Sequence, residues 1–295
     1  MGKTAYDAWR YSYASVLAFG TLGNILVIIS ILRQKRVLKN NYYFLVLHLA
    51  ISDLGALIIF LCDVKKGIVK VSTWYCGFSA TSYLFEVAGI GMMLVISVLR
   101  YRATVHPLKP AISRRKLKVV CGLVYLCGLI AGYGAYVPEC FLLNDPYWKF
   151  RNACSIFFFN VPTIFMAVAY YKISRALIKQ NRYMKSIYSN PVTRSAPGSS
   201  FNILRFVQNR RTFLVCLITI LCFGVGNIPM SVNLLFILAE EHHQDMKKFW
   251  IYYLASVLRV AGTHSVNPLI YGVLDKKLLT FWKLCRKKKP RTQEN

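Results

Sequence analysis

The sequence predicts an all-α membrane protein: a bundle of seven transmembrane helices, followed by a short amphipathic helix on the membrane surface. The chain is 56% hydrophobic and only 17% charged, whereas a soluble domain of this size exposes far more charge. Several mostly apolar stretches of about 20 residues are long enough to cross the hydrocarbon core of a bilayer. The basic residues, which give a formal charge of +27, lie between those stretches, so they indicate membrane orientation rather than nucleic-acid binding.

Seven apolar spans follow one another in what we expect to be a single domain, residues 1–295. They lie near residues 12–32, 42–63, 75–100, 117–138, 156–178, 212–238 and 249–273. An odd number of spans places the two termini on opposite sides of the membrane. Lys and Arg number 28 on the side of the carboxyl-terminal tail and 9 on the other side. This excess predicts an extracellular amino terminus and a cytoplasmic carboxyl terminus. We expect a multi-pass protein of the plasma membrane.

Two cytoplasmic segments have patterns of their own. The loop near residues 179–210 contains prolines, a glycine and several serines, and we expect it to be flexible, with its ends continuing the fifth and sixth helices. Residues 275–288 alternate apolar side chains with lysines, which predicts the amphipathic helix on the inner leaflet. Cys285, beside that helix, is a candidate for palmitoylation, although a free cysteine is the commoner outcome.

The seventh span is interrupted near its end by Asn267-Pro268-Leu269-Ile270-Tyr271. A proline removes a backbone donor and kinks a helix, and in lipid the freed carbonyl needs a partner inside the protein. Asn267 supplies one such partner. A broken last helix suits a bundle that switches between two states better than a passive anchor.

Polar side chains inside the spans are costly, so each one needs a reason. Ser52 and Asn233 are explained by hydrogen bonds between helices, worth on the order of 1 kcal/mol. Asp53 must be protonated, paired, or bound to a cation or water. Glu86 either faces a pocket and pairs with a cationic ligand, or is protonated, or pairs with His264 or Arg259.

Six motifs, in order and each on a different one of the seven expected helices, give the chain its resemblance to the rhodopsin-like (class A) G-protein-coupled receptors. The motifs are Gly23-Asn24, Leu49-Ala50-x-x-Asp53, Arg100-Tyr101-x-Ala103-x-x-x-Pro107-Leu108, Pro162 with Tyr170, Phe223 with Pro229, and Asn267-Pro268-x-x-Tyr271. Singly they are weak, but their order and spacing cover nearly the whole chain.

The resemblance implies an activation switch at the cytoplasmic end. Arg100 and Tyr101 would lie at the mouth where a heterotrimeric G protein inserts the last helix of its α-subunit. Tyr170 and Tyr271 would meet near Arg100 in the active state, together with the kink at Asn267 and Pro268. The hinge of the sixth helix would be formed by Phe223, Asn227 and Pro229.

The resemblance also implies a polar core and a disulfide. Asn24, Asp53 and Asn267 would form a water-filled core, where members of this family often bind a sodium ion. Cys76 would be bonded to the second extracellular loop, as the oxidising exterior allows. Cys154 is the favoured partner and Cys140 the alternative.

Two departures from the family pattern bear on triggering. The acid that usually precedes the arginine is Leu99, so the pair that restrains Arg100 in the off state is missing; the hypothesis is a raised basal activity, unless another group takes over. The tryptophan before the helix-six proline is Asn227.

The ligand would enter between the helices, near Ser82, Tyr83, Glu86, Asn233 and His264. Ser82 and Tyr83 stand where amine receptors keep an aspartate, so a monoamine loses its usual counter-ion. Ala261 stands at the retinal-lysine position, which argues against an opsin. Peptide, lipid and small organic ligands remain open.

Three other classes compete with this interpretation. A transporter or channel would use Asp53, Glu86 and His264 as an ion path, but it predicts internal repeats, and none is visible. An enzyme would need paired aspartates, a Ser/His pair or a metal cluster, and the nine cysteines show no metal spacing. The third alternative is a receptor relative that has lost G-protein coupling.

Overall fold

The computed structural model describes residues 3–66, 73–142, 145–188, 199–239 and 246–274. Within these ranges the regular structure is entirely helical. The helices are α1 (Lys3–Arg33), α2 (Lys35–Leu38), α3 (Asn41–Lys66), α4 (Thr73–Val105), α5 (Arg114–Leu142), α6 (Asp145–Tyr188), α8 (Ser199–Ala239), α9 (Met246–Val260), the π-helix η1 (Ala261–Ser265) and α10 (Asn267–Leu274).

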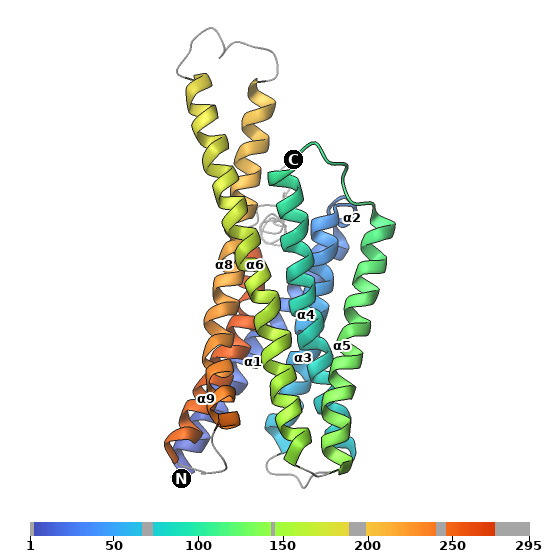
Figure 1. The fold of residues 1–295 in the computed structure, drawn as a ribbon, viewed down its shortest axis with the longest axis vertical. Helices are drawn as coiled ribbons and strands as arrows, with labels where there is room; N and C mark the ends of the chain where they lie inside the picture. Colours follow the sequence, from blue (N-terminus) through green and yellow to red (C-terminus); the bar gives the residue numbers. More distant parts are fainter. Residues whose placement is uncertain (1–2, 67–72, 143–144, 189–198, 240–245, 275–295) are drawn as a thin grey trace, which may run out of the picture.

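The long helices stand side by side as one bundle (Figure 1), and α1 begins at the lower end of that view. Six of them, α1, α3, α4, α5, α6 and α8, contain stretches long and apolar enough to cross a membrane. The seventh span is divided into α9, η1 and α10, so no single one of its helices reaches that length. The seven-helix class predicted from the sequence is confirmed.

Two helices are much longer than the apolar spans inside them. α6 has 44 residues and α8 has 41, and both extend beyond their neighbours at the upper end of Figure 1. Their extensions replace most of the loop expected near 179–210, which confirms that its ends continue the two helices. α6 also begins earlier than predicted, at Asp145, and Pro146 is tolerated because the first turn of a helix needs no backbone donor there. The amphipathic helix predicted over 275–288, with Cys285, lies outside the described residues.

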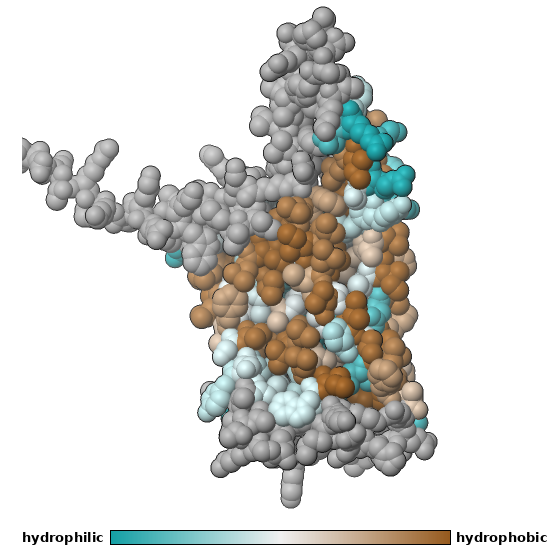
Figure 2. Space-filling view, turned by 90° about the vertical axis from the view of Figure 1, so that its left-hand side faces the viewer, coloured by the Kyte–Doolittle hydropathy of each residue, from teal (hydrophilic) through white to brown (hydrophobic). Residues whose placement is uncertain are grey.

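Large apolar side chains cover the outside of the bundle. Phe19 on α1, Ile130 on α5, Phe165 on α6 and Val225 on α8 are each at least half exposed, and Figure 2 shows hydrophobic residues across the middle of one face. A continuous apolar belt of this kind is the surface that lipid requires. The chain is therefore a multi-pass membrane protein.

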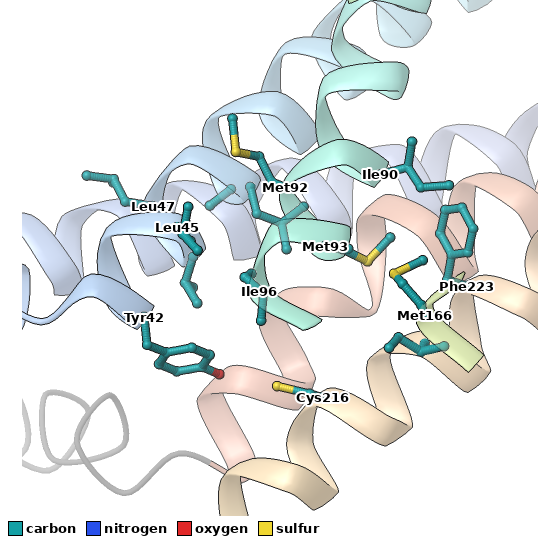
Figure 3. Close-up of a cluster of buried hydrophobic side chains, with 14 of the residues drawn as sticks. Tyr42, Leu45, Leu47, Ile90, Met92, Met93, Ile96, Met166, Cys216 and Phe223 are labelled. Atoms are coloured by element: carbon teal, nitrogen blue, oxygen red, sulfur yellow. The ribbon is translucent and has the colours of Figure 1, made fainter. Parts of the chain in front are cut away.

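α4 is the central helix and packs against α3, α5, α6 and α8. Its inner face contributes Ile90 and Met93 to the main core, where they lie near Met166 and the fully buried Phe223 (Figure 3). Against α5 the contact is closer: a Cβ atom on Gly128 would lie 2.6 Å from the carbonyl oxygen of Leu84. Small residues at such positions let membrane helices approach backbone to backbone. This packing fixes α4, and with it the groups at the middle of the bundle.

Candidate functional site

The π-helix η1 turns three consecutive side chains of the seventh helix towards three different neighbours. Thr263 accepts a hydrogen bond from Asn227 of α8 at 2.9 Å, His264 bonds to Asp53 of α3 at 2.8 Å, and Ser265 donates to a backbone carbonyl of α1 at 3.0 Å. All three are buried. A π-bulge inserts a residue into an α-helix and changes which side chains share a face. Here it makes one segment the junction of four helices.

The sixth-helix hinge lies against this segment. Asn227 also donates to the carbonyl of Phe223, one turn earlier, at 3.0 Å. Beside it α8 and η1 touch backbone to backbone, because a Cβ atom on Gly226 would lie 3.2 Å from the Cα of Gly262. Pro229 follows within the same helix. The hinge residues predicted from the sequence therefore meet the seventh helix at its π-segment, through an asparagine rather than a tryptophan.

Asp53 is the centre of the predicted polar core and is 1% exposed. One carboxylate oxygen contacts Nδ1 of His264, and the other accepts a hydrogen bond from Nδ2 of Asn267 at 2.8 Å. Asn267 also donates to the carbonyl of Thr263, at 2.7 Å, in the turn before Pro268. Of the alternatives left open for Asp53, the structure shows the paired one.

Asn24 completes the polar core from α1. Its amide donates to the carbonyl of Gly20 at 2.9 Å and to that of His264 at 3.1 Å. Pro268 has no backbone N–H, so the carbonyl of His264, four residues earlier, lacks its helical partner and needs a donor from a neighbouring helix. The predicted triad of Asn24, Asp53 and Asn267 is thus brought together, and His264 lies between its members.

A cavity of about 470 Å³ opens in the half of the bundle that holds the start of α1. Its walls come from α1, α3, α4, α6, α8, α9 and η1. Ser82, Glu86 and His264 line it, as predicted; Asn152 and Ser155 of α6 were not anticipated. Nε2 of His264 is buried and has no hydrogen-bond partner among the described residues. The cavity has the size of a ligand pocket.

An ion pair between Glu86 of α4 and Arg259 of α9 crosses this cavity. The guanidinium also lies over the ring of Phe159, 4.3 Å from its centre. A buried carboxylate is costly unless it is paired, and pairing with Arg259 was one of the options considered for Glu86. The ion pair joins the third and seventh helices directly.

Two residues of the predicted pocket do not line the cavity. Tyr83 is 1% exposed and packs edge to face against Phe159, with ring centres 6.1 Å apart. Asn233 is buried, and its Nδ2 has no hydrogen-bond partner in the described part of the chain. The interhelical bond expected for Asn233 is therefore not made, whereas Ser52 contacts the hydroxyl of Tyr125 on α5 at 3.2 Å, as expected.

At the other end of the bundle, Arg100 is half-buried and its guanidinium lies 4.2 Å from the centre of the Tyr42 ring on α3. Among the described residues it forms no ion pair. Tyr101 packs edge to face on His106, with centroids 5.5 Å apart. No local pattern predicts this contact, because Tyr42 and Arg100 are far apart in the chain.

Tyr170 is buried on α6 and stacks on Phe213 of α8, with ring centres 5.8 Å apart. This contact joins the fifth and sixth spans at the end that carries Arg100. The side chain of Tyr271 lies outside the described residues, so its meeting with Tyr170 stays a prediction.

The predicted disulfide between Cys76 and Cys154 is wrong. Cys76 is disulfide-bonded, but Cys154 is a free thiol. The reason is that Cys154 lies well inside α6, which begins at Asp145, and not in the loop where the sequence placed it. Cys140, whose side chain lies outside the described residues, stays the alternative partner.

Comparisons with known proteins agree with this geometry. The family model of the seven-transmembrane receptors (rhodopsin family) matches residues 23–271. The human neuromedin-K receptor is 24% identical over 286 residues, which cover 91% of this chain and 59% of that receptor. The rat substance-P receptor is 26% identical over 288 residues, covering 91% of this chain and 68% of that receptor. The G-protein coupled receptor E1 of equine herpesvirus 2 is 27% identical over 306 residues, which cover 90% of this chain and 70% of that receptor.

The chain spans about three fifths of the length of the neuromedin-K receptors it matches. The family match nevertheless includes the first-helix motif at Asn24, the arginine motif at Arg100 and the Asn267-Pro268 kink, and it covers most of the chain. The chain belongs to the rhodopsin family of seven-transmembrane receptors.

Proposed function

We propose that this protein is a G-protein-coupled receptor. It binds an extracellular ligand in the cavity beside Glu86 and Arg259, and it activates a heterotrimeric G protein at the opposite end, beside Arg100. Its amino terminus is extracellular and its carboxyl terminus cytoplasmic, because Lys and Arg are concentrated in the loops on the Arg100 side.

One observation carries the proposal: the cavity is connected to the switch by side chains in direct contact. His264 lines the cavity and contacts Asp53, and Asp53 accepts a hydrogen bond from Asn267 beside the helix-seven proline. A ligand that favours one arrangement of these groups shifts the population of the two bundle states. The family match is to receptors and does not support the transporter alternative.

The ligand of this chain can be approached through the relatives. Two of them are named as receptors for neuromedin K and for substance P, so these two compounds are the first probes. Peptide, lipid and small organic ligands all stay in the screen, because hydroxyl and amide side chains line the cavity beside the ion pair.

The deciding experiment measures nucleotide exchange on a panel of G proteins in membranes that contain the chain, alone and with each probe. We expect exchange above that of empty membranes, and its loss in an Arg100→Ala variant. Arg115→Ala is the matched control, since it removes an equal charge from an exposed position at the same end of the bundle.

Three outcomes separate the classes. Exchange that depends on Arg100 but not on Arg115 supports a coupled receptor and identifies its G protein. Exchange that is equal in both variants refutes the role given to Arg100. Binding of a probe without exchange on any G protein supports instead a receptor relative that has lost coupling.

A further inference from the structure

The surroundings of Asp53 consist of hydrogen-bond donors. Its two carboxylate oxygens face Nδ1 of His264 and Nδ2 of Asn267, each at 2.8 Å. An ionised carboxylate can only accept hydrogen bonds, so beside an ionised Asp53 the imidazole has to carry a hydrogen on Nδ1. The Nδ2 group of Asn24, from α1, donates to the backbone carbonyls of Gly20 and His264.

A sodium ion at this place would need oxygen ligands, as hard cations do. The structure offers few. α4 approaches Asp53 with Gly89, where a Cβ atom would lie 3.6 Å from the carboxylate oxygen that contacts His264, so this helix provides no side-chain oxygen there. Apart from the Asp53 carboxylate itself, the core offers amide oxygens, and Oδ1 of Asn267 is buried without a hydrogen-bond partner among the described residues. The residues fit a hydrogen-bonded carboxylate and do not fit a cation site.

The π-helix explains why a histidine occupies this position. His264 is fully buried between α1, α3 and the cavity. Its backbone carbonyl accepts a hydrogen bond from Asn24, and its Nδ1 contacts Asp53. An ion that entered beside Asp53 would have to displace this Nδ1 contact.

We propose that His264 takes the place of a bound cation at Asp53, and that the polar core of this protein is insensitive to sodium. The seventh helix thereby supplies the group that pairs with the Asp53 carboxylate of α3. His264 also lines the cavity, so a ligand in the cavity would contact the side chain that stabilises Asp53.

The test uses the thermal unfolding midpoint of the purified protein in detergent, which does not depend on G-protein coupling. Unfolding is followed in sodium chloride and in choline chloride at equal ionic strength. We expect the same midpoint in both salts. A midpoint that rises with sodium alone, and no longer rises in an Asp53→Asn variant, would overturn the proposal.

A double variant, Gly89→Ser with His264→Ser, sharpens the result. The space at Gly89 accepts a Cβ atom at ordinary contact distance, and the two hydroxyls give Asp53 oxygen neighbours in place of the imidazole. We expect this variant to gain a sodium-dependent rise that saturates, roughly 2–4 °C when sodium exceeds its dissociation constant about five-fold.

A folded double variant that stays insensitive to sodium would show that His264 is not the group that excludes the ion. If the double variant cannot be purified, His264→Asn alone is judged by the same criterion, because asparagine brings an amide oxygen to the same place. Nucleotide exchange in the two salts is then measured separately, so that failure of G-protein coupling is not mistaken for failure of this inference.

Discussion

Cations in the middle of the bundle and cations at its cytoplasmic end are held by different groups. Arg259 is paired with the carboxylate of Glu86 inside the bundle. Arg100, in contrast, rests on the ring of Tyr42 at 4.2 Å from its centre. A buried ion pair is strongly destabilised when one partner is removed, whereas a cation–π contact contributes on the order of 1–2 kcal/mol. The interior is thus fixed more firmly than the proposed G-protein mouth.

The composition of the loops explains why Arg100 contacts a ring and not a carboxylate. Residues 33–41, 100–118 and 172–211, which face the proposed cytoplasm, contain no Asp or Glu. With no acid in these three segments, aromatic rings at the start of α3 receive the cations: Arg114 of α5 likewise lies over Phe44, 3.7 Å from its centre. We infer that Tyr42 is the group that takes over the restraint of Arg100 from the missing acid at position 99.

The largest expected effect comes from breaking the interior pair. Arg259→Leu leaves Glu86 buried without its cation, and we expect the free energy of unfolding to fall by about 3–5 kcal/mol. The measurement is thermal or denaturant unfolding in detergent. The matched control is Glu86→Leu with Arg259→Leu, which removes both charges and should recover most of the loss. A single variant as stable as the wild type would mean that the pair contributes nothing to the fold.

The next largest effect is expected at the cytoplasmic end of the bundle, beside Arg100. Tyr42→Leu removes the ring beneath Arg100, and we expect basal nucleotide exchange to rise about 5- to 30-fold, which corresponds to about 1–2 kcal/mol in the balance between the two states. Tyr42→Phe keeps the ring face and should behave as the wild type. If Tyr42→Leu and the wild type exchange at the same rate at equal expression, Tyr42 does not restrain Arg100.

Restoring the family's acid should act in the opposite direction. Leu99→Asp places a carboxylate beside Arg100, and we expect basal exchange to fall about five-fold, for an ion pair of about 1 kcal/mol at this half-buried position. Leu99→Asn has a similar shape without the charge and should leave basal exchange unchanged. Equal exchange in the Asp variant and the wild type would contradict the hypothesis that the missing acid matters.

The sequence predicted those parts of the molecule that follow a local pattern. The seven spans came from apolar runs and the polar core from costly residues such as Asp53 and Asn267. Pairing of Glu86 with Arg259 was one of the alternatives that the sequence left open for Glu86. Only the structure shows that the two side chains are close enough to pair across the cavity. The predicted disulfide was wrong because nothing local shows that α6 begins at Asp145, well before the apolar span expected from residue 156.

Contacts between residues that are far apart in the chain could not be predicted from the sequence. Tyr42 and Arg100 share no motif, and their packing depends on how α3 crosses α4. The π-helix is hidden as well, since Gly262 and Thr263 fit an ordinary α-helix equally well; the backbone hydrogen bond from Val266 to Ala261, five residues earlier, reveals it. For the same reason His264 was placed in the pocket but was not assigned to Asp53.

The smallest expected effect concerns the bond between the sixth and seventh helices. Asn227 donates to Thr263 at 2.9 Å, and interhelical hydrogen bonds inside membranes average about 0.6 kcal/mol. A double-mutant cycle with Asn227→Leu and Thr263→Val should therefore give a coupling free energy of unfolding of that order. A coupling near zero would mean that the glycine contact between α8 and η1 alone joins the two helices. A coupling well above about 0.6 kcal/mol would mean that Asn227 stabilises the contact between the sixth and seventh helices about as strongly as a charged group would. The interior would then be stabilised at this contact as well as at the ion pair between Glu86 and Arg259.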